Sequence, residues 1–206
     1  MIRTLNVWLG VEIIYVYGTV NGVAATFTVG ENGYWQAVVP RAENDIYEIY
    51  VEAYSAGGLE GSYTITVYYG FHSPKTDWKK TDYENASDWN RQTGNIKHIA
   101  DEVLPALGYT AEQETIPTAH AETLPTAGLV NKLEGNLAAI ADSGTPLPAG
   151  WELSKVWDSG KPDYTDANRW ERNALLMQEQ AQRIAKRWQA SGTFSAGQTN
   201  ILPRRI

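Results

Sequence analysis

The chain has 206 residues, of which 20% are charged, and a formal net charge of −7. This acidic balance argues against a general nucleic-acid binder, because neutralising phosphates needs a clustered positive surface. The sequence has no cysteine, which excludes a disulfide framework, a thiolate metal site and a cysteine nucleophile. No stretch approaches the roughly 20 apolar residues of a membrane-spanning helix, and the N-terminus indicates a strand rather than a signal peptide.

Residues 1–70 have the alternation typical of strands with one buried face and one wet face. Turn signals separate the strands, at Asn21-Gly22, Asn32-Gly33 and Gly57-Gly58. We therefore predict a small antiparallel β-sandwich of six or seven strands, immunoglobulin-like in pattern but without the cysteine pair. The residues expected on the apolar face are Leu5, Val7, Leu9, Val11, Ile13, Tyr15, Tyr17, Trp35, Ala37, Val39, Tyr47, Ile49, Val51, Ala53, Tyr63, Ile65, Val67 and Tyr69.

Four aromatic residues fall on the opposite face of these strands: Trp8, Tyr50, Tyr54 and Tyr68. Exposed aromatic side chains suit contact with a partner protein, or stacking against sugar rings. The alternative is a second packed face of a sheet that is covered on both sides. The four residues are the candidate contact surface for a partner or a glycan.

Residues 71–190 are predicted to form a helical domain of three repeated helices, near 86–104, 127–142 and 167–189. Asn85, Thr126 and Asp166 are residue types that cap the free amides of a helix's first turn. Apolar residues follow at spacings of three, four and seven. These stripes are Trp89, Ile96, Ile99 and Val103, then Val130, Leu133, Leu137 and Ile140, then Trp170, Ala174, Met177, Ala181, Ile184 and Trp188.

The three helices share a sequence pattern. The phrase D-Y-x-x-A-x-x-W-x-R occurs at 82–91 and again at 163–172, and residues 126–142 align with 85–101, including Asn90 with Asn131 and Asn95 with Asn136. Tyr83, Leu124 and Tyr164 precede the caps and are expected to fold back onto each helix. Gly94 and Gly135 share a column and predict close helix–helix contact, with tolerated surface glycines as the alternative. The connectors, about 20 residues each, are long enough to run back alongside a helix as extended segments.

No pattern in the sequence predicts a catalytic, cofactor or metal site. The His98–Asp101 pair could ligate a metal, but a solvent-facing helix position is the simpler interpretation. The carboxylates at 82–88 and 163–166 fit helix starts, where negative charge is favoured, better than a calcium loop. We therefore expect no enzyme activity and no cofactor.

The segment SPKTDWKKTDYENASDWNRQTGNI, residues 73–96, resembles tail and baseplate-region proteins of phages and prophages of Gram-positive, Firmicutes-type bacteria. The matching positions are Pro74, Lys75, Thr76, Asp77, Trp78, Asp82, Tyr83, Asn85, Asp88, Asn90, Arg91, Asn95 and Ile96. The stretch PDYTDANRWER, residues 162–172, resembles a second part of the same proteins, with Glu171 where Asn is expected. Residues 20–70, with W-x-A-x-V-P-R-A and a closing Y-Y-G, are similar to their small Ig-like domains.

The resemblance implies a virion part made in the bacterial cytoplasm, not a reaction. Its expected partners are other tail proteins and further copies of itself, with a host-surface glycan as an additional partner. Residues 191–206 are interpreted as an extended arm that covers a neighbouring subunit through Phe194, Ile201 and Leu202, or else as a frayed end. The function expected is a structural adaptor of the tail, and the alternative is a carbohydrate-binding adhesion module.

Overall fold

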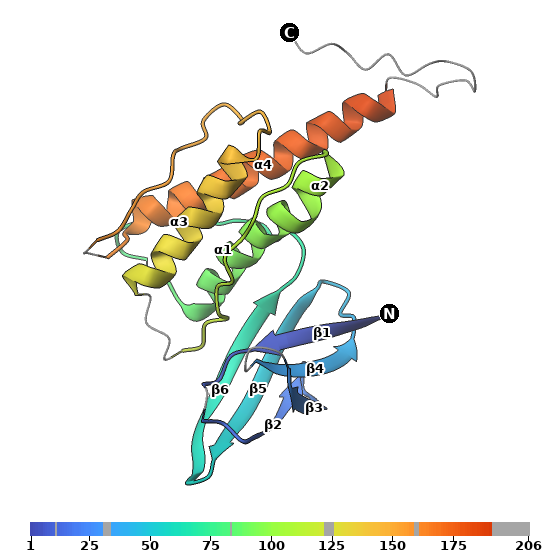
Figure 1. Ribbon diagram of the computed structural model, residues 1–206, viewed down its shortest axis with the longest axis vertical. Coiled ribbons are helices and arrows are strands. Elements are labelled where there is room, and N and C mark those ends of the chain that lie inside the picture. Colours follow the sequence, from blue (N-terminus) through green and yellow to red (C-terminus); the bar gives the residue numbers. More distant parts are fainter. Residues whose placement is uncertain (11, 31–33, 83, 122–125, 159–160, 191–206) are drawn as a thin grey trace.

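The computed structural model describes residues 1–10, 12–30, 34–82, 84–121, 126–158 and 161–190 (Figure 1). The expected arm residues Phe194, Ile201 and Leu202 lie outside these residues, as do Tyr83 and Leu124. The architecture is α+β in two parts, with an antiparallel sheet first and helices after it. Figure 1 shows the helices gathered at one end of the sheet, beyond the end of β6.

The N-terminal part is one curled antiparallel sheet with the strand order β1-β4-β3-β2-β5-β6. Asn21 and Gly22 have φ angles of 50° and 76°, which is the conformation that a tight hairpin needs between β2 and β3. The antiparallel all-β prediction is confirmed, while its assignment to the immunoglobulin-like class stays a prediction. The strands are β1 (Ile2–Val7), β2 (Tyr15–Val20), β3 (Val23–Val29), β4 (Trp35–Pro40), β5 (Ile46–Ser55) and β6 (Gly58–Tyr68).

The curl of the sheet brings its two end strands together around an apolar core. Tyr69, directly after β6, donates a hydrogen bond from its hydroxyl to the carbonyl of Thr4 in β1 at 2.9 Å, and Arg3 lies over the Tyr69 ring. Most of the predicted apolar face is buried here. The buried core residues include Leu5, Val7, Trp35, Ala37, Tyr47, Ile49, Val51, Ala53 and Ile65.

The prediction for β2 was wrong by one residue. Val16 and Val20 are buried, whereas Tyr15 and Tyr17 are exposed. Gly18 shares the buried face, because a Cβ added there would lie 2.2 Å from the Tyr50 carbonyl oxygen. A glycine between two valines hides the true apolar alternation, and the two tyrosines then suggest the opposite one.

The helices are α1 (Ala86–His98), the π-helical turn η2 (Ile99–Val103), α2 (Leu104–Ala106), α3 (Ala127–Asp142) and α4 (Tyr164–Ala190). Asn85 caps α1 and Thr126 caps α3, as predicted. The helices α1, η2 and α2 follow one another without a break and together cover the helix predicted near 86–104. Leu104 donates its amide to Ile99, five residues back, directly before Pro105, which has no amide to continue the α pattern.

The start of the third helix was predicted three residues too late. Asp163 accepts the amide of Thr165 at 2.8 Å, and its own amide is accepted by Asp166 at 3.1 Å. Asp163 is therefore the cap, Asp166 lies inside the first turn, and Tyr164 is the first helical residue rather than a residue that folds back. Asp163 and Asp166 are equally good capping types, so local sequence alone does not choose between them.

The apolar stripes of the helices form the second core. All of the predicted stripe residues of the first two helices are buried, as are Trp170, Ala174 and Met177 of α4. Gly94 does not make the predicted helix–helix contact. It lies against β6, where an added Cβ would come within 3.2 Å of the Tyr68 carbonyl oxygen, and Gly135 faces the connector at Glu114. The close approach joins the helical part to the sheet.

Candidate functional site

Each of the three main helices carries two asparagines five positions apart, in the pattern N-[R/K]-x-x-x-N. The stretches are NRQTGN (90–95) in α1, NKLEGN (131–136) in α3 and NRWERN (168–173) in α4. Four of these six asparagines are buried, Asn131 and Asn168 are half-buried, and all six bond to the extended connectors.

Every one of these side chains holds a single connector residue by two hydrogen bonds. The amide nitrogen donates to the carbonyl of that residue, and the amide oxygen accepts its backbone N–H. The distances, carbonyl first, are 2.8 and 2.8 Å for Asn95 with His72, 2.9 and 2.8 Å for Asn168 with Trp78, 2.9 and 2.7 Å for Asn136 with Glu114, 2.9 and 2.7 Å for Asn90 with Ala119, 2.8 and 3.0 Å for Asn173 with Glu152, and 2.8 and 2.8 Å for Asn131 with Trp157.

Asparagine suits this role because its amide presents one donor and one acceptor side by side, as a neighbouring strand would. The connectors form no ladder of their own among the described residues, so their buried peptide groups need such partners. We call these six pairings the asparagine clasps. They turn three extended connectors into fixed straps.

The clasps are arranged in a cycle. The strap before each helix is held first by the second asparagine of that helix, and further along by the first asparagine of the preceding helix. Thus Asn136 of α3 and Asn90 of α1 hold the strap that leads into α3. For the strap before α1, the preceding helix is α4, through Asn168. The last helix is therefore tied back to the first.

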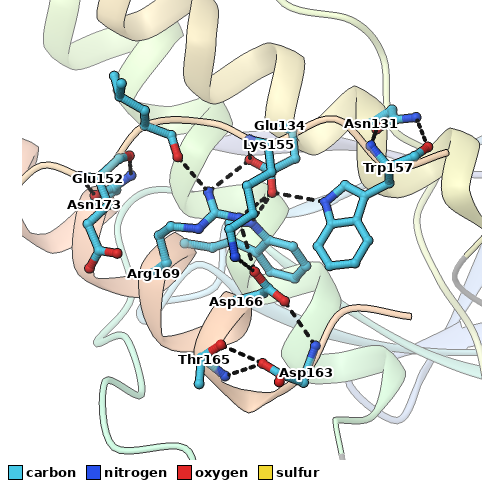
Figure 2. Close-up of polar contacts among 12 residues, drawn as sticks. Asn131, Glu134, Glu152, Lys155, Trp157, Asp163, Thr165, Asp166, Arg169 and Asn173 are labelled. Carbon is cyan, nitrogen blue, oxygen red and sulfur yellow. Dashed lines mark hydrogen bonds and ion pairs between the residues drawn. The ribbon is translucent and has the colours of Figure 1, made fainter. Parts of the chain in front are cut away.

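A buried charged cluster reinforces this arrangement between α3 and α4 (Figure 2). Arg169 donates from Nη1 to Glu134 at 2.9 Å and also pairs with it through Nη2. The indole nitrogens of Trp170 and Trp157 donate to Glu134 at 3.0 and 3.2 Å, and the amide of Lys155 does so at 3.1 Å. Both charged side chains are almost fully buried.

These contacts decide the charge state of Glu134. Burial by itself raises the pKa of this carboxyl, but the hydrogen bonds from Arg169, Trp170 and the Lys155 backbone outweigh burial and lower it. Glu134 is therefore ionised at neutral pH, with both oxygens occupied. Asp166 adds a further ion pair with the Lys155 ammonium at 2.6 Å, so the cluster fastens the strap before α4 to two helices.

A second charged group joins α1 to α4. Arg91 pairs with Asp88 at 2.8 Å and with Glu171 at 2.6 Å. Burial raises the pKa of Glu171 even though Arg91 favours its charged form. Close by, partial loss of hydration raises the pKa of Glu84, an exposed residue, to about 7, with smaller contributions from Asp88 and Glu171. Two carboxyls with raised pKa values therefore lie beside Arg91, and that of Glu84 is near neutral pH.

The structure brings together only two of the four predicted contact residues. The hydroxyls of Tyr50 and Tyr54 both donate to Glu52, at 3.2 and 3.0 Å. The ring of Tyr54 stacks on Tyr15 with centroids 4.6 Å apart, and Tyr17 meets both rings edge-on. The hydrogen bond to Glu52 raises the pKa of the Tyr54 phenol. We call Tyr15, Tyr17, Tyr50, Glu52 and Tyr54 the tyrosine face.

The other two predicted residues lie elsewhere. Trp8 pairs with Tyr34 at a centroid distance of 5.6 Å, near the end of β1. Tyr68 packs under α1, where its hydroxyl lies 2.7 Å from Ser87, so it joins the two parts instead of facing a partner. Tyr15 and Tyr17, which were predicted on the apolar face, lie beside Tyr50 and Tyr54 instead, because Tyr15 pairs with Tyr54 across the strands.

The chain matches no known family model, no curated protein and no solved structure.

Two further observations bear on chemistry. In the part of the chain that the structure describes, no group of three His, Asp or Glu side chains is placed to hold a metal ion. Across the same ranges, no helix is long and apolar enough to cross a membrane. His98, considered above as a ligand, instead lies 3.4 Å from Glu102 on its own helix. The arrangement can tie segments together and can present an aromatic surface.

Proposed function

We propose that this protein is a structural or adaptor component of a phage or prophage tail, in the baseplate or tail-fibre region. It acts through protein–protein contacts in virion assembly or host attachment, and it is made in the host cytoplasm. The proposal takes its source from the resemblance of residues 73–96 and 162–172 to tail proteins of Gram-positive phages. The structural observation that supports it is that the asparagine clasps and the Glu134–Arg169 pair hold the straps in place.

The asparagine clasps also support a finer proposal about the helical part. We take each strap with its following helix as one unit and infer that the unit occurs three times. The equivalent asparagines are 41 residues apart between the first two units and 37 residues apart between the next two, counted at Asn90, Asn131 and Asn168. Such a self-tied scaffold offers a rigid mount for a contact surface. The sheet remains a candidate immunoglobulin-like domain, because of its antiparallel strands and the resemblance of residues 20–70 to such domains.

The proposal includes no enzymatic activity. Glu134, Asp166 and Arg169 have the burial of catalytic groups, but each is engaged by fixed partners in the protein. A general acid or base must reach a substrate atom, and these side chains face one another.

The test is the composition of the particle. Phage particles induced from a strain that carries the gene are purified on a density gradient, and their proteins are quantified by mass spectrometry. The proposal predicts this chain in the particle band at a fixed ratio to the tail-tube protein. A chain found only in the unassembled fraction contradicts it.

Carbohydrate binding is the second candidate function, and the tyrosine face is the observation that favours it. Exposed tyrosine rings beside a carboxylate can stack on a sugar and accept its hydroxyl hydrogens. The test is a glycan array probed with the whole chain and with the Tyr50→Ser and Tyr54→Ser variants. Binding that both substitutions abolish supports this function, and an array without signal removes it.

A further inference from the structure

The tyrosine face is an exposed acidic surface. Tyr17 is 64% exposed, and Tyr15 and Tyr50 are each 42% exposed. Glu52 lies half-buried among these rings, and its neighbour on the same strand face, Glu48, is exposed. Exposed tyrosines of this density are typical of a contact surface rather than of a sheet that only faces water.

The charge of the sheet narrows the choice of partner. Residues 1–70 contain seven acidic residues and only two basic ones, Arg3 and Arg41. Both arginines pair with Asp45, at 3.0 Å in each case, and so neither serves the tyrosine face. In the described part of the sheet, Glu52 is contacted by tyrosine hydroxyls and by no cation. An arginine from a partner would stack on the rings and pair with Glu52.

The chain itself contains a segment of this chemistry. Residues 191–206, SGTFSAGQTNILPRRI, hold Arg204 and Arg205 and no acidic residue. They also hold Phe194, Ile201 and Leu202, which suit an aromatic surface. The segment begins where α4 ends, and Figure 1 shows that point at the opposite end of the molecule from the hairpin between β5 and β6. A second copy is the partner that can place this segment on the tyrosine face.

We propose that residues 191–206 of one copy dock on the tyrosine face of another copy, with Arg204 or Arg205 against the tyrosine rings and Glu52. This inference rests on the proposed function and names the partner that its contact surface takes. Because the two surfaces differ, each copy can hold the arm of the next in a head-to-tail contact, unless two copies exchange their arms as a closed dimer. Head-to-tail contacts close into rings or extend into filaments, which are the symmetries that a tail requires.

The experiment is the molecular mass of the whole chain in solution, measured by light scattering over a hundredfold range of concentration. The wild type is expected to form oligomers as its concentration rises. Removal of residues 191–206, the double substitution R204E/R205E and the single substitution E52R are each expected to leave a monomer. Combining E52R with R204E/R205E is expected to restore the oligomer, because the charges are exchanged across the contact.

Val156→Ser is the matched control, since Val156 is an exposed apolar residue of the strap before α4. It is expected to leave the oligomer unchanged. Val156 is exposed, Glu52 is half-buried on the outer face of the sheet, and Arg204 and Arg205 lie outside the described fold, so an unchanged thermal unfolding midpoint is expected and serves as the check on folding. A monomeric wild type overturns the inference, as does an oligomer that survives E52R and R204E/R205E. If the wild type is monomeric and a glycan binds its tyrosine face, the face is a carbohydrate site and the inference is wrong.

These outcomes are distinct from failure of the proposed function. A chain that is present in purified particles but monomeric alone keeps its place in the tail and loses only this contact.

Discussion

The sheet and the helical part bury polar side chains to very different extents. In the described residues, the buried polar and charged side chains all lie in the helical part, between residues 90 and 173. The sheet needs none, because each of its six described strands is hydrogen-bonded to a neighbouring strand. The helical part has long connectors without ladders, and their peptide groups would be left without partners if asparagines did not supply them. Polar burial here is a consequence of connector length.

The largest loss of stability is expected from breaking the buried ion pair of the helical part, which has no counterpart in the described sheet. Arg169→Met leaves Glu134 charged and buried without its cation, and the free energy of unfolding is expected to fall by about 3–5 kcal/mol. The measurement is denaturant unfolding followed by circular dichroism. Arg172→Met is the control on the same helix. Arg172 lies 3.6 Å from Glu152 with both side chains half exposed, so its loss is expected to stay below about 1 kcal/mol. If both variants lose the same free energy of unfolding, the buried pair of Arg169 with Glu134 is not a main source of stability.

The asparagine clasps come next in size. Asn131→Ala removes both hydrogen bonds to Trp157 and leaves a peptide group without partners, for an expected loss of about 2–3 kcal/mol. Gln182→Ala, an amide removed from an exposed position of α4, is expected to change stability by no more than about 0.5 kcal/mol. The two variants are compared by the same unfolding measurement. If Asn131→Ala is as mild as the control, the straps do not depend on their clasps.

The pH dependence of the helical part provides a third test. Glu84 has a folded pKa of about 7, above its unfolded value. It therefore contributes stability that is complete below pH 4 and is lost as the pH rises through about 7. Glu84→Gln, which stays neutral, is expected to unfold at a higher temperature than the wild type at pH 8 and at the same temperature at pH 4. Thermal unfolding is measured at both pH values, and a difference that is independent of pH counts against the raised pKa of Glu84.

The sheet is expected to respond to pH in the opposite direction, with the smallest effect. Hydrogen bonds from Arg41 and Arg3 outweigh burial and lower the pKa of Asp45. Its contribution is present above the unfolded pKa and is lost as the pH falls through the folded value. Asp45→Asn is expected to lower the unfolding temperature slightly at pH 7 and to match the wild type near pH 2. If the unfolding temperature of Asp45→Asn differs from that of the wild type more at pH 2 than at pH 7, the pKa of Asp45 is not lowered by folding.

The features that the sequence predicts well are those with local causes. Asn85 and Thr126 cap helices through their own side chains, so the starts of α1 and α3 are correct. The third start fails because the phrase that begins at Asp82 recurs after 81 residues, whereas the clasps at Asn90 and Asn168 are 78 residues apart. The pattern N-[R/K]-x-x-x-N would have located it, because the asparagines are the residues with a shared task.

The candidate surface was found only in part for similar reasons. Tyr50 and Tyr54 lie on a strand whose apolar face is unbroken, so their outward direction follows from alternation. Gly18 interrupts the apolar face of β2 and hid Tyr15 and Tyr17. The pairing of Glu134 with Arg169 has no signal at all in the sequence, because the two residues are 35 positions apart and meet only through the packing of α3 on α4. Local chemistry predicts the elements, while their partners depend on the assembled fold.

The claim that the straps are fixed by asparagine is tested most directly by hydrogen exchange. The six clasped residues are His72, Trp78, Glu114, Ala119, Glu152 and Trp157, and all lie outside helices and strands. The account predicts that their backbone amides exchange slowly, as amides in regular structure do, and that Asn131→Ala removes the protection of Trp157 first. Exchange of all six at the rate of an unstructured peptide would contradict it.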